Sequence, residues 1–141
     1  MPRVDFYILG TEQTKERFCC ELAGKIRKQD RDIYIHAASR EEAQSLDDLL
    51  WTYRDISFLP HAMAGEQSER DSIIIGWEDP VASGDSVMIN LGKNIPAQAE
   101  AYERVVEIVE DSNRQEGRNR YKLYRDAGFD MHNHDMSKEH G

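Results

Sequence analysis

The chain has 141 residues, of which 39% are hydrophobic and 32% are charged, and its formal net charge is −9. This composition is typical of one soluble globular domain, and the negative charge argues against binding duplex DNA through a general basic surface. No apolar run approaches the ~18 residues of a membrane span and no signal-peptide pattern occurs, so we expect neither membrane insertion nor export and predict a cytoplasmic location.

The first half of the chain predicts alternating strands and helices. The expected strands are 4–9 and 32–36, and the expected helices are 14–28 and 39–51. In the first helix, Phe18, Leu22 and Ile26 lie four residues apart on one side. Ser39 with Glu42 three residues later is a capping box that begins the second helix. This β-α-β-α order with short connections favours a parallel sheet covered by helices on both faces.

The second half predicts the same alternation. The expected strands are 72–76 and 86–91, the expected helices are 97–104 and 112–127, and 105–109 (VVEIV) is either a helix end or a strand. The valine and isoleucine content of that last piece favours a strand. Gly128 is expected to end the last helix as its C′ residue. We interpret 1–129 as a single α/β domain and the polar residues 130–141 as a frayed tail.

A basic segment near the end stands against the acidic background. Arg114, Arg118 and Tyr121 lie at positions i, i+4 and i+7 of the predicted helix, which is one face. A row of guanidinium groups beside a ring suits an acidic peptide that ends in an aromatic residue and a free carboxylate. The alternative is a solvated amphipathic helix whose tyrosines pack on the core.

An aromatic and apolar stretch covers residues 51–66 without a sustained period. Loops normally lie on the surface, so this much apolar content needs a cover. Either the stretch folds back onto its own domain or another protein covers it.

Motifs that carry chemistry are missing. Neither G-x-G-x-x-G, G-x-x-x-x-G-K-[ST] nor G-x-S-x-G occurs. The adjacent Cys19 and Cys20 have no nearby cationic motif, so we expect reduced, unreactive thiols. His132 and His134 form an H-x-H in the predicted tail, where solvated side chains are the simpler interpretation than a metal site. We therefore expect no catalytic site, no cofactor and no metal.

Several segments resemble the chi subunits of bacterial DNA polymerase III holoenzyme, which are accessory proteins of the clamp-loader complex. The resemblance covers most of the chain, and its most specific pieces combine rings, proline and cations in a way that no generic α/β fold requires. The matching segments are DFYILG (5–10), SREEAQSLDDLLW (39–51), SFLPHAMAGE (57–66), IIIGW (73–77) and RNRYKLYRDAGF (118–129). The resemblance implies a Rossmann-like domain without a nucleotide site and a non-catalytic bridging role in DNA replication.

The resemblance also implies two binding surfaces. One would bind the acidic C-terminal tail of single-stranded DNA-binding protein (SSB), so that DNA is reached only through that partner. Arg114 and Arg118 would pair with the tail's carboxylates, Tyr121 and Val109 would wall the pocket for its last phenylalanine, and Arg120 and Lys122 would add charge. The other surface would bind the psi subunit of the clamp loader, and its residues would be Trp51, Phe58, Leu59, Pro60 and His61. The family can have lysine at the position of Arg114, which keeps the charge but changes its geometry.

Two other function classes stay open. The first is a nucleotide-binding α/β enzyme that uses the carboxyl edge of the sheet near 10–14 and 37–40. The second is a direct binder of single-stranded nucleic acid that stacks bases on Tyr121 and Tyr124 beside Arg118.

Overall fold

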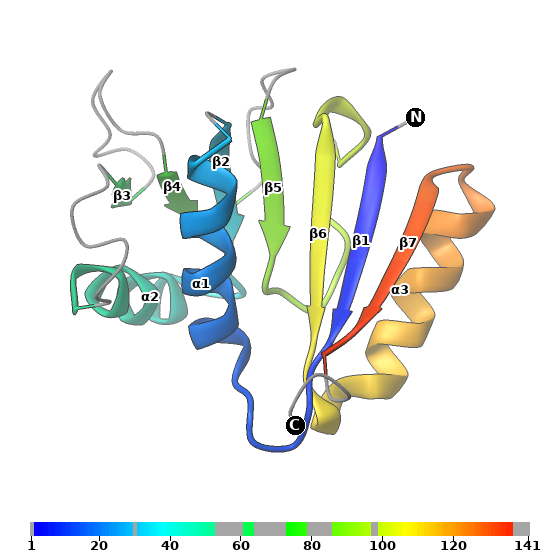
Figure 1. The fold of residues 1–141 in the computed structure, drawn as a ribbon, viewed down its shortest axis with the longest axis horizontal. Coiled ribbons are helices and arrows are strands. Elements are labelled where there is room, and N and C mark those ends of the chain that lie inside the picture. The colour runs from blue at the N-terminus through cyan, green and yellow to red at the C-terminus, as the bar shows by residue number, and fades with distance from the viewer. Residues whose placement is uncertain are drawn as a thin grey trace.

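The described strands form one parallel sheet (Figure 1). The computed structural model describes residues 2–29, 31–52, 61–63, 73–78, 86–96 and 99–136. The strands are β1 (Arg3–Ile8), β2 (Asp32–His36), β3 (His61–Met63), β4 (Ile73–Gly76), β5 (Ser86–Asn90), β6 (Arg104–Val109) and β7 (Asp130–Asp135). The helices are α1 (Lys15–Arg27), α2 (Arg40–Thr52) and α3 (Arg114–Asp126), with short 3-10 turns η1 (Ala99–Ala101) and η2 (Asp111–Asn113). The strand order is β3-β4-β2-β5-β6-β1-β7 and every neighbouring pair is parallel, which confirms the predicted fold class.

Local sequence signals place the helix ends. Thr14 caps α1, because its hydroxyl accepts a hydrogen bond from the backbone N–H of Arg17 at 3.4 Å. Ser39 caps α2 in the same way through the N–H of Glu42 at 3.2 Å. Gly128 has a φ of 91°, a conformation that costs glycine little, and it ends α3 as predicted.

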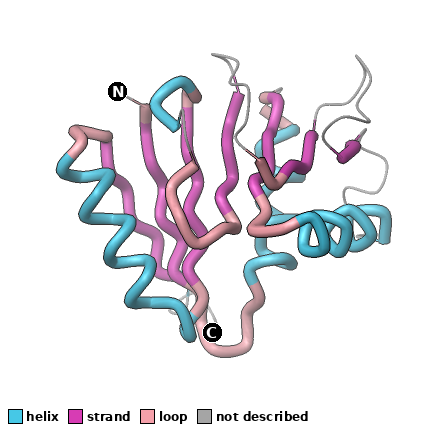
Figure 2. Tube along the Cα trace, turned by 180° about the vertical axis from the view of Figure 1, so that it is seen from behind, coloured by secondary structure: helices cyan, strands magenta, loops and turns pink. Residues whose placement is uncertain are grey.

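The helices cover both faces of the sheet and divide the core in two. The buried sides of α1 and α2 pack with Ile33, Ile35 and Ile89 into one cluster. Tyr124 of α3 packs on the opposite face with Phe6 and other strand residues. Seen from the opposite side, α3 lies beside the end of the sheet that β1 and β7 form (Figure 2). The carboxyl ends of β6 and β1 therefore lie next to the first turns of α3.

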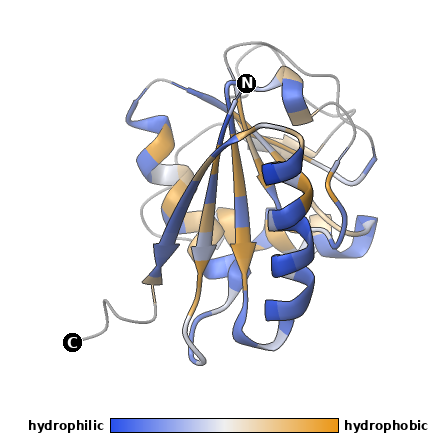
Figure 3. Cartoon of the chain, turned by 90° about the vertical axis from the view of Figure 1, so that its right-hand side faces the viewer, coloured by the Kyte–Doolittle hydropathy of each residue, from blue (hydrophilic) through white to orange (hydrophobic). Residues whose placement is uncertain are grey.

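The edge strand β7 corrects the prediction of a frayed tail. Residues 130–135 pair with β1 in parallel register, from Asp130 opposite Arg3 to Asp135 opposite Ile8. The strand is hydrophilic along most of its length (Figure 3). Long-range contacts hold it: His134 Nε2 lies 2.7 Å from a carboxylate oxygen of the fully buried Asp5, and its ring stacks on Tyr7 at 4.5 Å. A polar segment without alternation can thus form a strand when a buried carboxylate on its neighbour binds it.

Two further expectations have clear outcomes. The strand at 105–109 is confirmed as part of β6. The helix expected over 97–104 is shorter, because only η1 is helical among its described residues and β6 already begins at Arg104. Within the described ranges, no helix is both long and apolar enough to cross a membrane.

Candidate functional site

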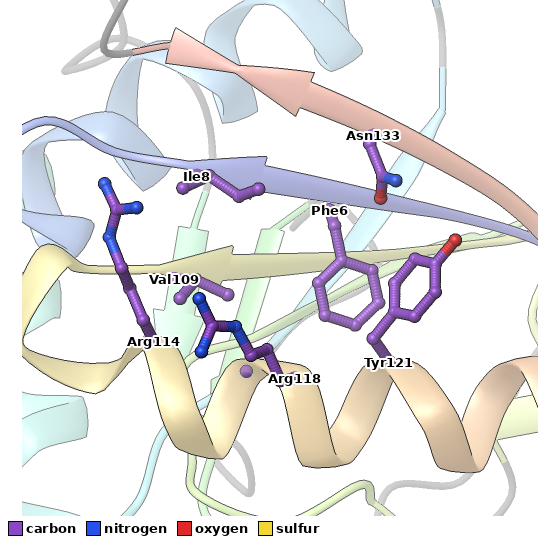
Figure 4. Close-up of a pocket in the computed structure, with 8 residues that line it drawn as sticks. Phe6, Ile8, Val109, Arg114, Arg118, Tyr121 and Asn133 are labelled. Carbon is purple, nitrogen blue, oxygen red and sulfur yellow. The ribbon is translucent and has the colours of Figure 1, made fainter.

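A hollow of about 310 Å³ lies between the first turns of α3 and the carboxyl ends of β1 and β6 (Figure 4). We call it the α3 groove. Residues from four elements line it: Phe6 and Ile8 of β1, Val109 of β6, Asn133 of β7, and Arg114, Gly117, Arg118 and Tyr121 of α3. Four of the residues predicted to bind a peptide tail, namely Val109, Arg114, Arg118 and Tyr121, therefore meet at one place.

The floor of the α3 groove is apolar because side chains alternate along the strands. Phe6 and Ile8 are two residues apart on β1 and therefore point to the same face of the sheet, the one that α3 covers. Val109 reaches the groove from the neighbouring strand. The ring of Tyr121 packs edge-on against Phe6 with 5.3 Å between centroids, an arrangement that aromatic pairs favour. These side chains offer an aromatic wall to an incoming ring.

Gly117 lets α3 approach β6 closely. A Cβ atom at this position would lie 2.8 Å from both Cγ atoms of Val109, closer than side-chain carbons normally come. Glycine inside a helix is ordinarily unfavourable relative to alanine by about 1 kcal/mol. The unfavourable residue is explained here by the space that the groove and the close helix–strand contact require.

The two arginines at the mouth of the groove differ in their surroundings. Arg114 Nε donates to a carboxylate oxygen of Asp111 at 3.0 Å, and both side chains are nearly half exposed. Arg118 is exposed, and no carboxylate of the described residues pairs with it. Figure 4 shows both side chains extending from α3 on either side of Val109. The charge of Arg118 is thus available to a ligand, whereas that of Arg114 is shared.

Arg120 and Lys122 lie away from the α3 groove, although the sequence predicted them to add charge there. Arg120 is buried and donates to Glu107 at 2.9 Å and to the backbone carbonyl of Lys93 at 3.1 Å. Lys122 is exposed and does not line the groove. The helical period explains Arg120, because a residue two positions after Arg118 points to roughly the opposite side of α3. Lys122 is four positions after Arg118 and so lies on a similar side, but it is one turn further along the helix and is not among the residues that line the groove.

The pair between Arg120 and Glu107 belongs to a buried network that anchors α3. Glu107 is fully buried and also accepts hydrogen bonds from Tyr124 at 2.7 Å and Asn90 at 2.9 Å. Burial raises the pKa of Glu107, an effect that the guanidinium of Arg120 and these hydrogen bonds oppose. Burial and the Glu107 carboxylate also raise the pKa of Tyr124. The network fixes which face of α3 turns toward the groove.

The predicted psi surface lies largely outside the described residues. Phe58, Leu59 and Pro60 fall in a range that the structure does not describe, as does the side chain of His61. Trp51, at the end of α2, is 57% exposed, a high value for so large an apolar side chain. Single exposed apolar side chains are common on soluble proteins, so this exposure alone does not mark an interface.

A second hollow of about 700 Å³ lies at the carboxyl ends of β2, β4 and β5. Ser39 at the start of α2, Trp77 after β4 and Lys93 after β5 are among its lining residues. No glycine-rich phosphate loop adjoins it, since the sequence contains none. Its place at the carboxyl edge of a parallel sheet is where α/β folds commonly bind ligands.

The cysteines and His132, which the sequence raised as possible reactive or metal-binding groups, are buried or paired within the fold. Burial raises the pKa of the Cys20 thiol to about 12 and that of Cys19 well above its usual range, as expected of unreactive thiols. His132 pairs with Asp130 at 3.0 Å. In the part of the chain that the structure describes, no three His, Cys, Asp or Glu side chains gather closely enough to hold a metal ion.

Sequence reasoning missed Phe6, Ile8, Gly117 and Asn133 as groove residues. Phe6 and Ile8 were interpreted only as strand residues, although their spacing of two places them on one face. Gly117 was a usable signal, because a glycine in the middle of a basic helix requires a packing reason. Asn133 gave no signal, since it lies in a segment that was predicted to be frayed.

Comparison with known proteins finds one family and three relatives, all of which carry the same name. The family described as DNA polymerase III chi subunit, HolC, matches residues 1–132. A Pseudomonas aeruginosa protein named DNA polymerase III subunit chi is 31% identical over 142 residues, which cover 98% of this chain and 99% of that protein. Proteins of the same name from Escherichia coli strain K12 and Haemophilus influenzae are 32% and 30% identical, over 93% and 89% of this chain and 96% and 92% of theirs.

These matches span nearly the whole chain, and the segment they cover includes α3 and most of the groove residues. The chain therefore belongs to the DNA polymerase III chi subunit family.

Proposed function

We propose that this member of the family is a non-catalytic accessory subunit of DNA polymerase III that bridges two partners. The α3 groove binds the acidic C-terminal tail of SSB, and a separate surface around Trp51 binds the psi subunit of the clamp loader. DNA is then reached through SSB and not through this chain. The observation that carries the proposal is the exposed guanidinium of Arg118, which pairs with no carboxylate of the described residues and lies beside an aromatic-walled hollow.

The chemistry of the groove matches such a tail. A terminal phenylalanine ring can pack against Phe6 and Tyr121, and one aromatic pair contributes about 0.5–1.5 kcal/mol beyond its buried area. A guanidinium binds a carboxylate through two parallel hydrogen bonds, so Arg118 suits the chain end. The first turns of α3 also favour a negative group, because the helix dipole is positive there.

Electrostatics predict a weak and salt-sensitive complex. The chain carries a formal charge of −9, so an acidic peptide is repelled overall and attracted only near the groove. Exposed charges are screened over about 8–10 Å at physiological salt. Affinity should therefore fall as salt rises, and it should depend on the buried aromatic contact as well as on charge.

The test is a titration with a labelled acidic peptide that ends in Pro-Phe. The free-acid peptide should bind, and the same peptide with an amidated terminus should lose most of its affinity. Arg118→Met should cost about 1–3 kcal/mol, which is the usual range for a central arginine contact. Arg125→Met is the matched control, because Arg125 is an exposed cation of the same helix that pairs with Asp126 and does not line the groove. Equal binding of the free and amidated peptides would refute the assigned role of Arg118.

The psi surface needs a separate test. Trp51→Ala should weaken capture of psi and leave the binding of the SSB peptide unchanged, because Trp51 does not line the α3 groove. Loss of both activities in a variant whose melting temperature is unchanged would contradict two independent surfaces.

One observation favours a second candidate function. The hollow beside Ser39 and Lys93 is large enough for a small ligand, and it includes part of the edge where the sequence left a nucleotide site open. Nucleotides at millimolar concentration should raise the melting temperature if that site is real. If nucleotides leave the melting temperature unchanged, this candidate is ruled out.

Direct binding of single-stranded nucleic acid has less support. The stacking platform that the sequence left open includes Tyr124, but this side chain is only 1% exposed and donates to Glu107. Tyr124 is therefore unavailable for stacking a base. Titration of a bare oligonucleotide with and without SSB separates direct from mediated binding.

A further inference from the structure

The contact between Asp111 and Arg114 lies at the mouth of the α3 groove. Asp111 begins η2 and Arg114 begins α3, so the spacing of three residues brings their side chains together on one side of the turn. Arg114 lines the groove, whereas Asp111 does not. A carboxylate of the protein itself thus binds one of the two guanidinium groups that face the ligand.

The geometry of this contact limits what Arg114 can offer. A guanidinium presents five N–H donors, and it grips a carboxylate best with two parallel bonds. Asp111 takes the Nε donor at 3.0 Å, so it occupies the side of the guanidinium that includes Nε. An incoming carboxylate must either displace Asp111 or bind the remaining Nη donors. Arg118 imposes no such competition, because no described carboxylate pairs with it.

We infer that Asp111 is a built-in competitor that sets the affinity and selectivity of the groove. This inference rests on the proposed binding of an acidic peptide end. Arg118 takes the terminal carboxylate, and a second carboxylate of the ligand must displace Asp111 before it can use the Nε side of Arg114. The groove then favours peptides with at least two carboxylates near an aromatic end over peptides that carry the terminal carboxylate alone.

Both side chains of the Asp111–Arg114 pair are about half exposed, so the competition is modest. Exposed ion pairs contribute little, and the loss of one corresponds to a change of about two- to fivefold in an equilibrium constant. Removing Asp111 should therefore tighten binding of a peptide with two carboxylates by about that factor.

The experiment measures peptide affinity by fluorescence anisotropy at one fixed ionic strength. Asp111→Asn is compared with Glu116→Gln, which removes a like charge from the first turn of α3. Among the described residues Glu116 forms no ion pair with Arg114, and it does not line the groove. Each substitution is made in the wild-type protein and in Arg114→Met. Two peptides are used, one with an acidic residue before its aromatic end and one with that residue replaced by its amide.

Asp111→Asn should strengthen binding of the acidic peptide about two- to fivefold more than Glu116→Gln does. In the Arg114→Met background, Asp111→Asn should strengthen binding no more than Glu116→Gln does, because Asp111 acts through the guanidinium of Arg114. The amide peptide should gain less from Asp111→Asn than the acidic peptide gains.

Equal changes in peptide affinity for Asp111→Asn and Glu116→Gln would overturn the inference, because they would show that only the loss of a negative charge matters and not the contact with Arg114. An advantage that persists in Arg114→Met would overturn it as well. In both cases the wild-type protein still binds the peptide, so the proposed function stands. A wild-type protein that binds neither peptide removes the proposed function and the inference together.

Discussion

Gly117 is the position where a single methyl group should separate the stability of α3 from the function of the groove. At an ordinary exposed helix position, replacing glycine by alanine stabilises the fold by about 1 kcal/mol. Here the new Cβ would lie 2.8 Å from both Cγ atoms of Val109, whereas carbon atoms prefer about 3.5–4.0 Å. Because both branches of Val109 are equally close, rotating its side chain does not open the space.

The helix must therefore move away from β6 by roughly the missing distance, on the order of 1 Å. Overpacking of this kind costs about 1–3 kcal/mol, so the net destabilisation of Gly117→Ala should be about 0–2 kcal/mol after the propensity gain. The methyl group also points at Val109 in the wall of the groove, so affinity for the peptide should fall even where stability changes little.

Urea unfolding and peptide titration of Gly117→Ala measure the two effects, and Val109→Ala provides the compensating change. Val109→Ala alone should destabilise the fold by leaving a cavity. The double variant should be more stable than the sum of the single changes predicts, because the added methyl group enters the space that Val109 vacates. A Gly117→Ala protein that gains about 1 kcal/mol and binds peptide normally would refute the close-packing argument, as would strict additivity in the double variant.

Two further predictions concern the buried charges. Arg120→Met leaves Glu107 buried without its cation, so urea unfolding should show that the free energy of unfolding falls by about 3–5 kcal/mol. The exposed control Arg125→Met should change it by less than about 1 kcal/mol. Similar losses in both variants would contradict the anchoring role of Arg120. Burial alone would raise the pKa of Asp5, but hydrogen bonds from its two arginine neighbours and a histidine hold that pKa below its ordinary value. Its stabilising contribution is therefore complete above the unfolded-state pKa of about 3.9 and is lost as the pH falls through the lower folded-state value. Unfolding measured between pH 6 and pH 2 should show this loss, and Asp5→Asn should flatten it; an unchanged pH profile in that variant would count against the assignment.

The sequence by itself determined much of the architecture. Short apolar runs separated by amphipathic segments predict parallel strands covered by helices, since each element must bury one face. The start of α2 followed from Ser39 and the end of α3 from Gly128, because capping is a local property. The arrangement of Arg114, Arg118 and Tyr121 on one face was equally readable, since the helical period alone sets it.

The tertiary structure decided what those local patterns could not. Arg120 looks in sequence like another cation of the basic helix, and only its contact with Glu107 shows that it is an internal anchor. Strand β7 has no apolar alternation, and it forms because Asp5 and Tyr7, far away in sequence, bind His134. The floor of the groove comes from Phe6 and Ile8, more than a hundred positions before α3. Hydrophobic period and capping act over a few residues, whereas a buried ion pair or a groove is created only when distant segments are brought together by the sheet.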